Sequence, residues 1–177
     1  MKKIIINSAL IIIFIITYFL HSNFFTWFKI AGVMPNLFVV LVLFIGLYAH
    51  KFMGVTYGII FGLLLDCFIG KKIGITSIML GVVGIVGVVF DKNFSKENRI
   101  TLLVMVMIAT VVFETGEYII GYFINRGYLE IGPFIQILLI ECAYNSILTI
   151  ILYPLIRNFG NKMETEYKGN KILTRYF

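Results

Sequence analysis

The chain has 177 residues, of which 60% are hydrophobic and 14% charged, with a mean hydropathy of +0.97 and a formal net charge of +6. Soluble domains average about 45–50% apolar and about 25% charged residues, so this composition excludes an ordinary soluble domain and indicates lipid as the solvent. The positive charge does not indicate nucleic-acid binding, because the basic residues are scattered through loops and tails. Both cysteines lie in apolar runs, so a disulfide framework is not indicated.

Six apolar stretches each approach the roughly 20 residues that a helix needs to cross about 30 Å of hydrocarbon. Helices are expected because lipid offers no partner to an unpaired backbone group. The predicted fold class is therefore all-α, with one six-helix transmembrane domain over residues 1–157. The predicted spans are 4–20, 35–48, 52–69, 73–90, 100–124 and 133–156.

The first stretch begins like a secretory signal peptide, with Lys2 and Lys3 before the apolar run. The run is long for a signal core, and the residues from His21 to Phe25 offer no cleavage site. We therefore expect a retained helix. The short second span is expected to start with Pro35 as its first helical residue, or earlier near Ile30 with Pro35 as a kink.

The segment between these two spans, residues 22–34, is rich in aromatic side chains. Anchoring at the membrane interface is the ordinary explanation for such residues. A lid over an outward-facing pocket is the alternative.

The basic residues predict the orientation of the chain. With six spans and both termini inside, eleven of the 15 Lys and Arg residues fall in cytoplasmic segments. The positive-inside rule favours this arrangement. Residues 158–177 then form a basic cytoplasmic tail, which either lies on anionic lipid or is disordered in solvent.

Glycines recur in the third predicted span, where Gly54, Gly58 and Gly62 share one helix face. Small residues at this spacing let two helix backbones approach closely, and such packing drives helix association in lipid. Three further glycines lie in the fourth span: Gly81, Gly84 and Gly87. The face packs either within the bundle or against a partner's helix, and the sequence does not distinguish these.

Four acidic residues lie within the predicted spans: Asp66, Glu114, Glu117 and Glu141. Ionisable groups are costly in hydrocarbon and usually face the interior of a bundle. A rise of 1.5 Å per residue puts all four in the outer half of the membrane, where Asn145 shares a face with Glu141. Three basic residues at the same end could neutralise them: Lys71, Lys72 and Arg126. The alternative is an acidic, outward-opening cleft for a cationic side chain or ligand.

A catalytic arrangement is not visible in the sequence. His21 and His50 fall at opposite membrane faces, and the serines in the spans lack a basic neighbour. The glycines lie on lipid-length helices and not in a phosphate-binding loop. We therefore predict no enzymatic activity, no cofactor and no metal site.

Residues 62–74 fit the pattern G-L-x-x-D-x-x-x-G-x-x-x-G. Its fixed positions are Gly62, Leu63, Asp66, Gly70 and Gly74. Together with Pro35, Gly58 and the six apolar stretches, this motif resembles the MreD family of bacterial rod shape-determining membrane proteins. The specific match covers residues 35–74, and Asn36 departs from it, because the family commonly has an acid there.

The motif also has a physical interpretation of its own. Gly70 and Gly74 bracket a predicted turn, where glycine adopts positive φ without strain. Asp66 is expected to accept hydrogen bonds from this turn and to cap the next helix, whose N-terminus favours negative charge.

The resemblance implies a non-catalytic subunit of the cell-wall elongation machinery in the bacterial cytoplasmic membrane. The partners it implies are MreC, RodA, a class B penicillin-binding protein and the MreB cytoskeleton. It also implies a bundle similar to the substrate-binding subunits of energy-coupling-factor vitamin transporters. A small-molecule binding subunit of a transporter is therefore the alternative function.

Overall fold

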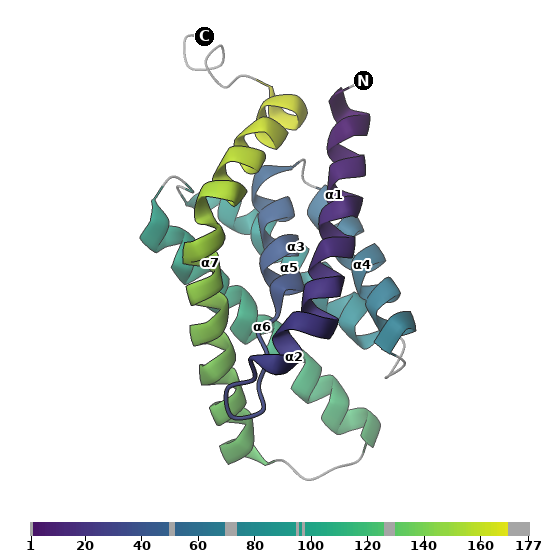
Figure 1. Cartoon of the computed structure of the whole chain (residues 1–177), viewed down its shortest axis with the longest axis vertical. Coiled ribbons are helices and arrows are strands. Elements are labelled where there is room, and N and C mark those ends of the chain that lie inside the picture. Colours follow the sequence, from purple (N-terminus) through teal and green to yellow (C-terminus); the bar gives the residue numbers. More distant parts are fainter. Residues whose placement is uncertain are drawn as a thin grey trace.

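The computed structural model describes residues 2–49, 52–69, 74–94, 96, 98–125 and 130–169, which are almost entirely helical and contain no strand. The long helices of this part, drawn in Figure 1, are α1 (Lys2–Phe19), α3 (Leu37–Tyr48), α4 (Met53–Ile69), α5 (Ile75–Asn93), α6 (Arg99–Asn125) and α7 (Ile131–Lys168). After α1 the chain continues through a π-helical turn, η1 (Leu20–Phe24), and a short helix, α2 (Phe25–Trp27). The predicted all-helical class is confirmed.

Four helical stretches of the described residues are long and apolar enough to cross a membrane, namely 3–27, 75–93, 99–124 and 131–168. The helices α3 and α4 are apolar but shorter. At 1.5 Å per residue α3 is about 18 Å long, less than the roughly 30 Å of hydrocarbon. Six complete spans therefore remain a prediction.

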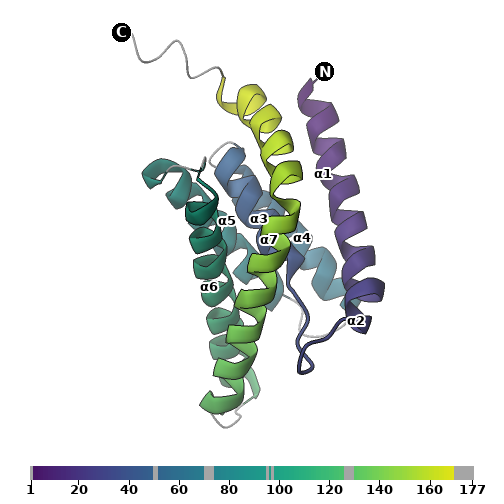
Figure 2. The same cartoon turned by 60° about the vertical axis from the view of Figure 1, so that its left-hand side comes forward.

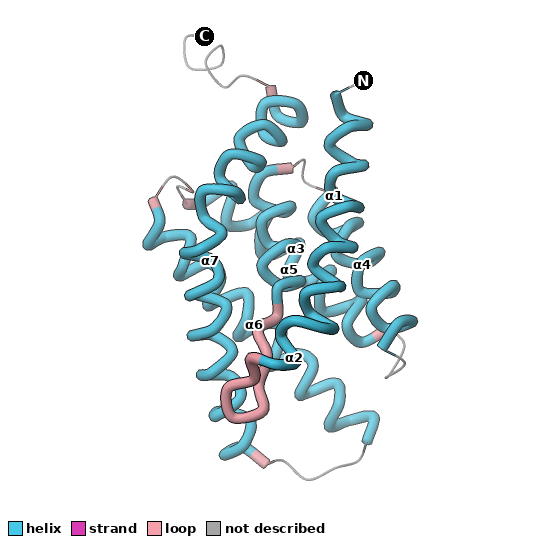
Figure 3. The backbone as a smooth tube through the Cα atoms, viewed as in Figure 1, coloured by secondary structure: helices cyan, strands magenta, loops and turns pink. Residues whose placement is uncertain are grey.

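Helix α3 forms the centre of the bundle, and all of its residues except Leu41 are buried. This burial fits a helix that is apolar on every side. Its N-cap is Asn36, whose side chain accepts a hydrogen bond from a backbone N–H of the first turn at 3.4 Å. Both expectations for Pro35 are therefore wrong. It is not the first residue of the helix, and it does not kink the helix, because it precedes the N-cap. Figure 3 shows the preceding segment as a loop.

Helices α4 and α5 contact each other through glycine backbones. A Cβ on Gly54 would lie 2.6 Å from Gly46 Cα of α3, and one on Gly58 or Gly62 would collide with the backbone of α5. Gly84 of α5 lies against the backbone of α4 in the same way. The predicted glycine face is thus filled within the chain, so it is not open to a helix of another protein.

Helix α1 lies at the edge of the bundle, and α6 and α7 run side by side (Figure 2). Six isoleucines of α1 are exposed: Ile4, Ile5, Ile11, Ile12, Ile15 and Ile16. An apolar face of this extent is unusual on a soluble monomer. Lipid is its natural environment.

Helix α7 continues beyond the predicted end at Ile156, so the predicted tail 158–177 begins inside a helix that ends at Lys168. The added turns are helical because they still have a buried face. Gly160 packs on the ring of Tyr48, and Met163 is 2% exposed. Residues 170–177 lie outside the described residues.

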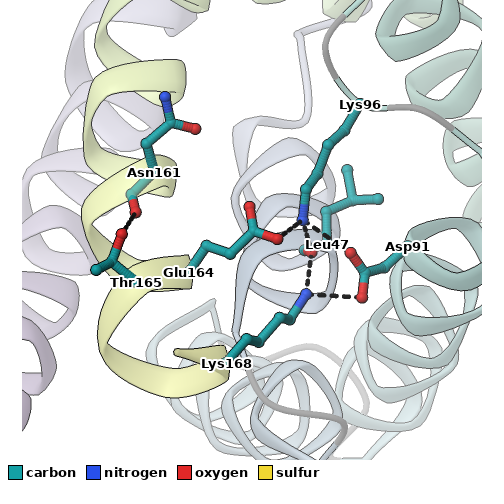
Figure 4. Close-up of polar contacts among 7 residues, drawn as sticks. All are labelled: Leu47, Asp91, Lys96, Asn161, Glu164, Thr165 and Lys168. Atoms are coloured by element: carbon teal, nitrogen blue, oxygen red, sulfur yellow. Dashed lines mark hydrogen bonds and ion pairs between the residues drawn. The ribbon is translucent and has the colours of Figure 1, made fainter. Parts of the chain in front are cut away.

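Four charged residues connect the end of α7 to α5 and α3 (Figure 4). Lys96 Nζ lies 2.8 Å from Asp91 Oδ1 and 2.9 Å from Glu164 Oε1, and Lys168 Nζ lies 2.7 Å from Asp91 Oδ2. Both lysines also donate to the carbonyl of Leu47, at 3.0 Å and 2.8 Å. This carbonyl belongs to the last turn of α3, where carbonyls lack helical partners, so the two ammonium groups cap that helix end.

The glycine contact predicts that Gly58→Ala destabilises the protein by about 1–3 kcal/mol, because the new methyl group meets the Leu80 backbone and the helices must separate. Gly121→Ala is the matched control, since a Cβ there meets nothing within 4 Å. Thermal unfolding of both variants in detergent measures the difference. Equal melting temperatures would contradict the packing described.

The charged network predicts that Asp91→Asn loosens the end of α7, because it removes an ionised acceptor from both lysines. A hydrogen bond to a charged group contributes about 1.5–3 kcal/mol. Amide hydrogen exchange over residues 160–168 should therefore become faster, by tenfold or more. The exposed Lys162→Gln is the control and should leave exchange unchanged. Identical protection in both variants would show that the network does not hold α7.

Candidate functional site

A cavity of about 320 Å³ lies at the end of the bundle opposite the chain termini. It is enclosed by the end of α1 with its η1 turn, by the loop before α3, and by α4, α5, α6 and α7. Its polar lining residues are His21, Asn36, Asp66, Thr76, Glu117 and Glu141. Elements from the whole length of the chain contribute, so the cavity exists only when the bundle is folded.

Asp66 ends the glycine face of α4 and is 3% exposed. Its Oδ2 accepts hydrogen bonds from Gly74 N at 2.7 Å and from Ser77 N at 3.3 Å. Gly74 has a φ of 102°, which glycine adopts without strain. The carboxylate thus lies at the N-terminus of α5, where free N–H groups and the positive end of the helix dipole favour an anion.

Glu141 enters the cavity from α7 and is 5% exposed. Its Oε1 is buried and has no hydrogen-bond partner within the described part of the chain. Glu114 of α6 comes close enough to hydrogen-bond with Glu141, although Glu114 does not line the cavity.

Glu117 lies one helical turn after Glu114 on α6 and lines the cavity. Its Oε1 accepts a hydrogen bond from Thr76 Oγ1 of α5 at 3.1 Å. This hydrogen bond holds the acid of α6 against the first turn of α5. The structure brings Asp66, Glu117 and Glu141 from three helices to the lining of one cavity, and Glu114 is not among the lining residues.

Asn145 supports the cavity without lining it and is 0% exposed. Its Oδ1 accepts from Asn36 N at 2.8 Å, and its Nδ2 donates to Thr110 Oγ1 at 3.0 Å. These bonds attach the loop before α3 to α6 and α7. Asn145 is therefore a positioning residue for the loop.

The loop from Phe28 to Asn36 closes one side of the cavity. Ile30 and Val33 exchange two backbone hydrogen bonds of 3.1 Å and 2.9 Å around a tight turn. The two central residues of the turn, Ala31 and Gly32, have φ values of 49° and 82°. Positive φ at both positions is the type I′ conformation, which glycine accepts more easily than alanine. Non-helical backbone at membrane depth is tolerated where it lines a cavity, as this loop does.

The aromatic residues before this loop have different environments. Trp27 is 89% exposed, as an interfacial anchor would be, whereas Phe25 is 6% exposed. Tyr144 Oη donates to the Phe28 carbonyl at 2.6 Å and so holds the start of the loop on α7. The segment therefore combines an exposed anchor with a fixed wall of the cavity.

The remaining predicted motif residues have structural positions. Pro35 is buried immediately before the cap of α3, and Leu63 is 42% exposed on the outer side of α4. Gly70 and the predicted basic partners of the acids, Lys71, Lys72 and Arg126, lie outside the described residues, as does His50.

Sequence reasoning missed three polar lining residues, His21, Asn36 and Thr76. The sequence offers His21 only as a possible partner of His50 in a metal or catalytic site. It offers Asn36 only as a departure from the family pattern. Thr76 follows the motif by two residues, and its position on the first turn of α5 was the available signal.

The lining of the cavity is rich in carboxyl groups. Three carboxyl side chains line it, and one carboxyl oxygen lacks a donor. Ammonium and guanidinium groups supply donors and opposite charge together. Within the described residues, no three His, Cys, Asp or Glu side chains are grouped so as to hold a metal ion.

No curated protein and no solved structure matches the chain, so the expected similarity to vitamin-transporter subunits remains a prediction. The family model described as rod shape-determining protein MreD matches residues 1–163. This match extends well beyond residues 35–74, which contain the motif. The chain belongs to the MreD family of rod shape-determining membrane proteins, and is thus a multi-pass membrane protein with a role in cell shape.

Proposed function

We propose that this protein is a non-catalytic subunit of the cell-wall elongation complex in the bacterial inner membrane. It acts as a scaffold for MreC, for MreB and for the synthase pair of RodA and a class B penicillin-binding protein. Family membership supports the role in cell shape. The observation that carries the scaffold assignment is the buried, unpartnered carboxyl oxygen of Glu141 in an open cavity.

In this proposal all six long helices cross the membrane, and both termini are cytoplasmic. The helices α3 and α4 cross together with the segments that flank them. Basic residues support this orientation. Arg99 and Arg157 line one cavity beside the C-terminal part of α7, and the two lysines that bind Asp91 lie at the end of that helix. The cavity lined by Asp66, Glu117 and Glu141, called the acid cavity from here on, then opens to the extracytoplasmic side.

The cavity receives a cationic side chain from the extracytoplasmic part of a partner. A buried acceptor without a donor costs about 1–3 kcal/mol, and an incoming Lys or Arg removes this penalty. The acids Glu117 and Glu141 lie on different helices, so one cation contacting both also fixes α6 relative to α7. Binding therefore orders the scaffold as well as recruiting the partner.

A small-molecule binding subunit of a transporter is the second candidate. The volume of the cavity, about 320 Å³, falls at the lower end of the roughly 300–1,000 Å³ of ligand pockets. Thermal stabilisation of the purified protein by a member of a vitamin panel would favour this function over the scaffold.

Depletion of the protein in its host should convert rods to round cells, because the elongation complex loses a membrane subunit. Cell width measured by microscopy over successive divisions is the readout. Expression of the wild-type chain from a second locus is the control and should restore rods. Rods that persist after complete depletion, in a host without a second copy of the gene, would contradict the proposal.

Glu141→Gln should lower the yield of MreC co-purified with this protein by about tenfold, since charge-assisted hydrogen bonds contribute about 1.5–3 kcal/mol. Glu114→Gln and Glu117→Gln should have smaller effects, because the first does not line the cavity and the second keeps its bond from Thr76. Glu130→Gln, exposed at the same end, is the matched control. Unchanged yield in all three cavity variants would remove the cationic contact.

A further inference from the structure

A second cavity lies between α6 and α7 at the end of the bundle that carries the chain termini. Its volume is about 430 Å³. It is lined by Arg99 and Leu103 of α6 and by residues of α7 between Thr149 and Asn158. We infer that this cavity binds an anionic phospholipid, with the phosphate on the two arginines and an acyl chain on the apolar wall.

Two arginines, Arg99 and Arg157, line the cavity, and no acidic residue is among its described lining residues. The Arg99 guanidinium lies 5.0 Å from the centre of the Tyr153 ring, which holds it at the rim by a cation–π contact. Guanidinium groups present several donors in a planar fork, which matches the oxygens of a phosphate.

The polarity of the cavity changes with depth. Arg99 is the first residue of α6, and Leu103 lies about 6 Å deeper, one turn along that helix. On α7, Ile150 lies about 10 Å deeper than Arg157. The arginines therefore lie at the membrane interface, and the aliphatic side chains line the part that enters the hydrocarbon.

This gradient selects an amphiphile over a free ion. Inorganic phosphate would contact the rim alone and leave the apolar wall uncovered. A phospholipid fills both parts, and basic pockets between transmembrane helices on the cytoplasmic side suit anionic headgroups. Pro154 lies in the cavity wall, and a proline inside a helix removes one backbone bond and bends the helix, so the gap between α6 and α7 has a local cause.

The test uses the full chain purified in a neutral detergent, with phosphatidylglycerol titrated and bound lipid counted by native mass spectrometry. The variant is Arg99→Gln with Arg157→Gln. The matched control is Lys92→Gln with Lys162→Gln, which removes two charges from exposed positions at the same end of the bundle. We expect the arginine variant to bind phosphatidylglycerol about tenfold to thirtyfold more weakly than the wild type. The lysine variant should bind it as the wild type does.

Three further arms make the result specific. Phosphatidylcholine should bind the wild type and the arginine variant equally weakly. Inorganic phosphate at millimolar concentration should not displace phosphatidylglycerol. Arg157→Gln alone, at an exposed position, should give at least a threefold loss even if the double variant folds poorly, and melting temperatures check folding.

Equal losses in the arginine and lysine variants would overturn the inference, because binding would then follow net charge alone. Displacement by inorganic phosphate would assign the site to a free anion instead. An acidic peptide that outcompetes the lipid at equal concentration would assign the cavity to a protein partner. None of these results bears on the acid cavity or on the scaffold function proposed for it.

Discussion

The backbone contact between α4 and α5 is the constraint on which the rest of the structure depends. Helices in lipid gain little by hiding apolar surface from one another, so close packing supplies their association. The glycines of α4 bring the two backbones together. Where this contact ends, one turn after Gly62, Asp66 lies at the N-terminus of α5. The same contact sets part of the lining of the acid cavity, since Asp66 and Thr76 both belong to it.

The two ends of the bundle have opposite electrostatic character. Carboxyl groups gather in the acid cavity, whereas the other end carries the capped terminus of α3 and the arginines Arg99 and Arg157. Helix α7 connects these ends, because Glu141 belongs to the acid cavity, Arg157 to the lipid cavity and Lys168 to the charged network. A cation bound in the acid cavity and a lipid bound between Arg99 and Arg157 would therefore both contact α7. In a scaffold, the two ligands could stabilise the same helix.

The sequence predicted the features that depend on local spacing. Repeated glycines on one face predicted a close helix contact. The position of Asp66 before a glycine turn predicted that its carboxylate accepts hydrogen bonds from the start of α5. Periodicity shows which residues share a face but not which helix meets that face, so the bond between Asn36 and Asn145 was not foreseeable. The extension of α7 was not predicted for a related reason, because its polar residues contact distant segments. Lys168 binds Asp91 and the Leu47 carbonyl, and Glu164 binds Lys96.

Cysteine accessibility tests most directly whether the two cavities open to opposite sides of the membrane. After Cys67 and Cys142 are replaced by alanine, single cysteines are placed at Ile137, in the acid cavity, and at Asn158, in the lipid cavity. A membrane-impermeant maleimide added to intact spheroplasts should label Ile137→Cys, and should label Asn158→Cys only after permeabilisation. Labelling of Asn158→Cys in intact spheroplasts, with Ile137→Cys protected until permeabilisation, would contradict an acid cavity that faces outward to meet a partner.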